Sequence, residues 1–102
     1  MHHHFLNIML NKEKEITQTL ITKQFEINTN ELWDDFLDAF FKRIDYLLRF
    51  DFEKLIQICY RMDIAEDKFK EALTNHEKPS ERLAELFIQR AYQKTAYRIK
   101  YS

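Results

Sequence analysis

Glycine is absent from this chain of 102 residues, and proline and cysteine each occur once. Tight hairpin turns and phosphate-binding loops need residues with positive φ, which glycine supplies at the lowest steric cost. A meander of strands and a phosphate-cradling loop are therefore not expected. The only cysteine is Cys59, so no intrachain disulfide can form, which fits a reducing compartment and a cytoplasmic location.

Long apolar runs are also missing, since none exceeds three residues, and no membrane-spanning segment is expected. The start of the chain, MHHHFLNIML, lacks a basic segment followed by an apolar one and does not resemble a signal peptide. Residues 1–4 are expected to be a flexible terminus, with His2, His3 and His4 either native or the remnant of a tag. A chain terminus rarely holds metal ligands in fixed positions, so no metal site and no cofactor are predicted.

Apolar material is plentiful: hydrophobic residues make up 45% of the chain, with nine Phe and five Tyr. This is enough to build the core of one domain spanning residues 1–102. Most apolar positions recur at three- and four-residue spacing, which is typical of amphipathic helices. The sequence predicts an all-α fold, a compact bundle of four to five helices.

The segment of residues 14–27 allows two interpretations. Apolar residues at positions 9, 16, 20 and 27 follow helical spacing. The same segment is rich in β-branched residues and alternates over Ile21, Phe25 and Ile27, which favours an extended strand. No other segment alternates well, so such a strand would be exchanged with a second copy of the chain. The helix is the favoured interpretation.

A long helix is predicted after Asn28–Glu31, which has the spacing of a capping box. Its apolar residues cover about 180° of a helical wheel, and they are Leu32, Trp33, Phe36, Leu37, Phe40, Phe41, Ile44, Leu47 and Leu48. An arc this wide predicts a helix that is either central in the bundle or half of an oligomer interface. Asp51, Asp63 and Ser80 are the expected N-caps of three further helices.

The stretch from Ile58 to Leu73 has the rhythm of a helix-turn-helix, with Cys59 at a small inward position and Asp63 where a turn glycine often stands. DNA recognition requires bases and amides on the second helix. That helix instead begins with Glu66 and Asp67 and carries a net charge of −1 over its surface. The stretch therefore predicts a packing corner and not a DNA-reading motif.

The segment Ile44–Ile64, IDYLLRFDFEKLIQICYRMDI, and the later LFIQRAYQK resemble a family of short uncharacterised helical proteins from Bacteroidetes-type bacteria. An ID-x-LL…DFE-x-L…YR-x-D pattern recurs in that family. The resemblance implies a helical fold and a bacterial, cytoplasmic setting, and it implies no catalytic residue.

No nucleophile–base pair, metal-ligand spacing or phosphate loop is visible, so an enzyme is not expected. The surplus of aromatic residues instead predicts a protein that acts by protein–protein interaction, first of all by self-association. The residues expected at this interface are Trp33, Phe36, Phe40, Phe41, Phe50 and Phe52.

A nucleic-acid-binding protein is the alternative prediction, because residues 76–102 hold three acids and six bases. Cations interleaved with aromatic rings can bind single strands through phosphate contacts and stacking. The residues expected to do so are Arg90, Lys94, Tyr97, Arg98 and Lys100.

Overall fold

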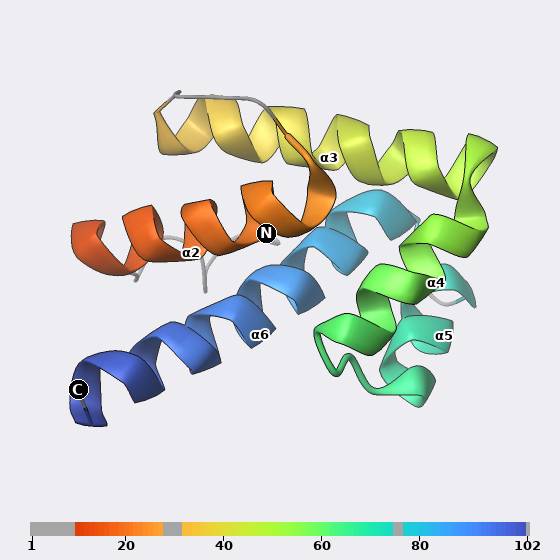
Figure 1. The fold of residues 1–102 in the computed structure, drawn as a ribbon. Coiled ribbons are helices and arrows are strands. Elements are labelled where there is room, and N and C mark those ends of the chain that lie inside the picture. The colour runs from red at the N-terminus through yellow and green to blue at the C-terminus, as the bar shows by residue number, and fades with distance from the viewer. Residues whose placement is uncertain (1–9, 28–31, 75–76, 102) are drawn as a thin grey trace.

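The computed structural model describes residues 10–27, 32–74 and 77–101, with side chains described up to residue 95. These residues form five helices and no strand (Figure 1). The helices are α2 (Asn11–Phe25), α3 (Trp33–Phe50), α4 (Phe52–Arg61), α5 (Glu66–Thr74) and α6 (Pro79–Tyr101). The predicted all-α bundle of four to five helices is confirmed.

Helix α2 settles the ambiguity of residues 14–27. It is a continuous α-helix that buries Thr17, Ile21 and Phe25, spaced four residues apart on one face. The helical spacing therefore prevails over the β-branched composition, because packing of an amphipathic face outweighs intrinsic propensity. The strand alternative is wrong, and α2 packs against α6 and α3 of its own chain.

Helix α3 buries Phe36, Phe40, Ile44 and Leu47, the centre of the wide apolar arc. It runs parallel to α2, and α6 returns in the opposite direction below both (Figure 1). Its N-cap is Leu32, which makes no side-chain cap hydrogen bond. The capping box expected from Asn28 to Glu31 lies outside the described residues.

The expected cap of α4 is confirmed, because the Oδ1 atom of Asp51 accepts a hydrogen bond from the Lys54 backbone at 3.3 Å. The expected cap of α6 is wrong. That helix begins at Pro79, one residue before Ser80, and the fixed φ of proline suits the first helical position. The Ser80 hydroxyl instead donates to the carboxylate of Asp45 on α3 at 3.2 Å.

Three phenylalanine rings occupy the centre of the core. Phe25 of α2 meets Phe40 of α3 and Phe87 of α6 edge to face, each with ring centroids 4.8 Å apart. All three side chains are fully buried. One continuous cluster surrounds them and includes residues of every described helix, so the described helices share a single core.

At two helix ends in the described part of the chain, a non-glycine residue adopts the positive φ that glycine usually provides. Glu26 follows α2 and Asp63 follows α4, both with φ of 57°. After α4, the Ile64 N–H bonds to the Cys59 carbonyl and the Asp63 N–H bonds to the Tyr60 carbonyl, the pattern of a Schellman motif. Each acidic residue pairs with a cation of another helix, Glu26 with Lys54 and Asp63 with Arg90.

Candidate functional site

Exposed aromatic rings gather where α3 passes into α4. Phe50, the last residue of α3, is 72% exposed, and Phe52, the first of α4, is 43% exposed. Tyr46 lies one turn before Phe50, is 50% exposed, and contacts it with ring centroids 5.2 Å apart. These three residues are named the corner patch. The Phe52 ring also contacts the ring of buried Phe69 of α5, with centroids 6.0 Å apart, so part of Phe52 packs against the core.

The predicted interface residues divide between the core and the surface. Phe36 and Phe40 are fully buried and have no surface to offer a partner. Trp33 and Phe41 are half-buried and pack against the core cluster. Only Phe50 and Phe52 of the six are exposed to a large extent.

Sequence reasoning missed Tyr46 as a surface residue of this patch. The signal for it was its four-residue spacing from Phe50, because side chains at i and i+4 meet on a helix surface. The guanidinium of Arg43 lies 5.6 Å from the centroid of the Tyr46 ring and extends the patch towards the end of α2.

Charges around the corner patch are balanced. Between residues 43 and 54 the chain carries three bases, Arg43, Arg49 and Lys54, and three acids, Asp45, Asp51 and Glu53. Arg49 pairs with Asp45 within α3, at 3.0 Å, and both side chains remain largely exposed. A rim with no net charge does not attract a polyanion. It can pair with a surface whose bases lie opposite its acids and whose acids lie opposite its bases.

The predicted nucleic-acid residues are only partly available. Arg90 is half-buried: its Nε donates to the Met62 carbonyl at 3.1 Å, and a terminal nitrogen lies 3.5 Å from an Asp63 carboxylate oxygen. Lys94 is half-buried as well. The side chains of Tyr97, Arg98 and Lys100 lie outside the described residues.

The helix-turn-helix shape of residues 58–73 is present, and its second helix packs through Phe69 and Ala72, as a packing corner requires. Glu66 and Asp67, in the first turn of α5, are exposed and acidic. The predicted capping role of Asp63 at this corner is not what the contacts show, because its carboxylate lies against Arg90.

The single cysteine, Cys59, is buried. Burial raises the pKa of the Cys59 thiol to about 12, so it stays protonated and packs as a small apolar side chain. Within the described residues no cluster of His, Cys, Asp and Glu has the arrangement of a metal site. None of the described helices is long and apolar enough to cross a membrane.

Comparison with protein families, with characterised proteins and with solved structures finds no significant match to this chain.

Proposed function

We propose that this protein acts through protein–protein contact, and that its first partner is a second copy of itself bound at the corner patch. The observation that carries the proposal is the exposure of Tyr46, Phe50 and Phe52 at the end of α3 and the start of α4, with the rings of Tyr46 and Phe50 in contact. Exposed apolar patches on a small domain commonly mark interaction surfaces.

The size of the patch suits the centre of an interface. The exposed fractions of its three rings correspond to roughly 300 Å² of side-chain surface left in water. A stable interface buries about 800 Å² per partner, with aromatic residues in the middle and a polar rim around them. The flanking charged side chains would supply that rim.

The balanced rim favours a second copy as the occupant. In a twofold-symmetric dimer the same surface meets itself, so each acid near the axis can face a base of the partner only if the patch carries both signs. Arg49, Asp51 and Glu53 flank Phe50 and Phe52 in sequence and are all exposed. Such a surface complements itself electrostatically, whereas a surface of one sign would repel its copy.

Sedimentation equilibrium of the wild type and of Phe50→Asp tests the proposal. A carboxylate in the middle of an apolar interface should weaken self-association by more than about tenfold. The matched control is Tyr60→Asp. Tyr60 is 74% exposed but lies at the far end of α4, about 12 Å along the helix axis from Phe52. A wild type that stays monomeric at high micromolar concentration, or equal loss in both variants, would overturn the proposal.

Nucleic-acid binding by α6 remains the alternative proposal, supported by the basic balance of residues 76–102. Titration of a labelled single-stranded oligonucleotide at low salt, followed by anisotropy, separates it from self-association. Binding that falls steeply with salt and is lost in Arg98→Glu would favour the alternative. Absence of binding at low salt would end it.

A further inference from the structure

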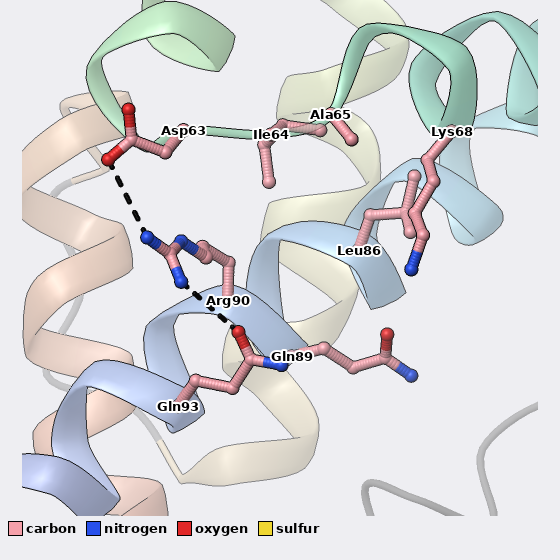
Figure 2. Close-up of a pocket in the computed structure, with 8 residues that line it drawn as sticks. All are labelled: Asp63, Ile64, Ala65, Lys68, Leu86, Gln89, Arg90 and Gln93. Carbon is pink, nitrogen blue, oxygen red and sulfur yellow. Dashed lines mark hydrogen bonds and ion pairs between the residues drawn. The ribbon is translucent and has the colours of Figure 1, made fainter.

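A small cleft lies between the turn after α4, the first turn of α5 and the middle of α6. Its volume is about 150 Å³. Its apolar lining is Ile64 and Ala65 of the turn and Leu86 of α6, and Gln89, Arg90 and Gln93 of α6 are among its polar lining (Figure 2). This volume equals roughly five water molecules in the liquid, so the cleft suits a ligand of a few heavy atoms and not a drug-sized one.

Arg90 forms one wall of the cleft and is held in place by three contacts. Its Nε donates to the Met62 carbonyl at 3.1 Å, one terminal nitrogen donates to Gln93 Oε1 at 3.3 Å, and the other lies 3.5 Å from Asp63 Oδ2. A guanidinium carries five N–H donors in a planar fork, so these contacts orient the group and leave donors for a ligand. Planar, bidentate pairing with a carboxylate is the geometry that arginine prefers.

The carboxylate already beside Arg90 is loosely held. The separation of 3.5 Å from Asp63 exceeds the 2.7–2.9 Å typical of a tight charge-assisted hydrogen bond, and the Asp63 side chain is 70% exposed. Asp63 adopts the positive φ that the end of α4 requires, and its carboxylate is directed at the Arg90 guanidinium (Figure 2). Asp63 therefore stands where a carboxylate from outside could replace it.

A second cation faces the same cleft. Lys68 of α5 is exposed and has no ion-pair partner among the described residues, and Figure 2 shows it extending from α5 towards Leu86 and Gln89. Lys70, on the same helix, instead pairs with Glu66 at 3.3 Å and does not line the cleft. The charged groups of the lining are therefore Asp63, Lys68 and Arg90, with a net charge of +1.

We infer that this cleft binds a small carboxylate ligand. Arg90 takes the carboxylate in place of Asp63, Lys68 adds the second positive charge, and the amides of Gln89 and Gln93 bond to the remaining polar atoms. The ligand is either a short free acid or the terminal carboxylate of a polypeptide. This inference does not depend on the corner patch, which lies on other helix turns.

Titration of ¹⁵N-labelled protein with succinate, followed by amide chemical shifts, tests the site, with succinamide as the uncharged control. The assay uses the wild type and the Phe50→Asp variant, so that self-association does not affect the result. Saturable shifts at Ala65, Lys68 and Arg90 with succinate, absent with succinamide, are expected. No saturation up to about 50 mM, a concentration far above that expected for a millimolar site, with succinate and also with a short peptide that has a free C-terminus, would overturn the inference.

Three variants sharpen the test because they move the affinity in different directions. Lys68→Gln should weaken succinate binding by at least about fivefold, and the matched control Lys70→Gln should leave it unchanged. Asp63→Asn should tighten binding severalfold, because it removes the internal competitor while asparagine still accepts positive φ. Equal effects of the two lysine variants, or unchanged or weaker binding in Asp63→Asn, would show that Arg90 and Lys68 do not form a carboxylate site.

The two sources of carboxylate are separated by a short peptide with a free C-terminus and the same peptide amidated. Binding of the free peptide and not of succinate assigns the cleft to a chain terminus. Binding of succinate and not of the peptide assigns it to a free acid. Binding of the amidated peptide as tightly as the free one would contradict carboxylate recognition.

Discussion

The two ends of helix α2 are held in different ways. At its C-terminal end, Phe25 packs edge to face on two rings, and the Nε of Arg43 donates to the Phe25 carbonyl at 3.1 Å. Arg61 of α4 reaches the side chain of Gln24 at 3.1 Å and its backbone carbonyl at 3.5 Å. The negative end of the helix dipole is therefore met by cations from two other helices.

Two turns earlier, the buried position of α2 is occupied by Thr17, whose hydroxyl has no hydrogen-bond partner in the described part of the protein. Helices α2 and α6 run in opposite directions, and Phe25 contacts Phe87. Thr17 lies eight residues before Phe25 and Thr95 lies eight residues after Phe87, so the two threonines are at the same height along the helix pair. Thr95 is also fully buried, and its hydroxyl likewise has no hydrogen-bond partner among the described residues. The same helix pair thus gains stability at one end and loses some of it at the other through buried hydroxyls.

The largest effect on the free energy of unfolding is expected where Phe25 contacts Phe40 and Phe87. Phe25→Ala should lower the free energy of unfolding by about 3–5 kcal/mol, because it removes a fully buried ring and leaves a cavity between Phe40 and Phe87. Denaturant unfolding measures this. The matched control is Phe50→Ala at the end of α3, which is 72% exposed and should change stability by less than about 0.5 kcal/mol. Similar losses in both variants would break the distinction between core and corner patch.

The cationic contacts at the same end should contribute less. Arg43→Ala should destabilise the protein by about 1–2 kcal/mol, because the Phe25 carbonyl loses a charged donor. Arg49→Ala, which removes only an exposed pair with Asp45, should cost less than about 0.5 kcal/mol. If the two variants were equally stable, capping of α2 by Arg43 would not contribute to the stability of this end.

At the opposite end of the α2–α6 pair, a substitution should increase the stability of the protein. Thr95→Val should raise the free energy of unfolding by about 1 kcal/mol, since it replaces an unpartnered buried hydroxyl by a methyl group of similar size. Thr19→Val is the control on α2, because that hydroxyl is exposed and donates to the Glu15 carbonyl. A loss of stability in Thr95→Val would mean that its hydroxyl is satisfied and that the two ends of α2 do not differ in this respect.

The smallest effect is electrostatic and depends on pH. The hydrogen bond and charge of Lys54 hold the pKa of the Glu26 carboxyl below its usual value of 4.5. A lowered pKa in the folded state means that this contribution is complete above pH 4.5 and is lost as the pH falls through the folded pKa. Unfolding curves of the wild type and Glu26→Gln should therefore converge on acidification. A constant difference between them would contradict this assignment.

Local signals predicted those parts of the fold that depend on one stretch of chain. The apolar spacing of α3 predicted its buried face, and Asp51 caps α4 as expected. The capping predictions were wrong where a side chain instead bonds to a residue far away in the sequence. Ser80 was expected to cap α6 but bonds to Asp45, and Asp63 was expected to cap α5 but ends α4 and faces Arg90. The order of residues does not show whether such a side chain bonds to a local backbone group or to a distant side chain.

The candidate site shows the same division. Phe40 and Phe50 are both aromatic residues of α3 and were both predicted at the interface, yet Phe40 is fully buried and Phe50 is 72% exposed. The difference arises because Phe40 lies where α2 and α6 both reach α3, as its contacts with Phe25 and Phe87 show, whereas Phe50 stands at the end of the helix. The cleft beside Arg90 had no sequence signal, because its residues come from two separate segments, from Asp63 to Lys68 and from Leu86 to Gln93.

The sequence by itself determined that the chain is helical, since it has no glycine for hairpins and its apolar residues recur at helical spacing. It also determined that aromatic residues dominate the apolar surface of α3. Only the tertiary structure decided which rings are covered and which cations meet in a cleft. The physical reason is that burial and charge pairing depend on what other helices bring to a position, and that information is not local.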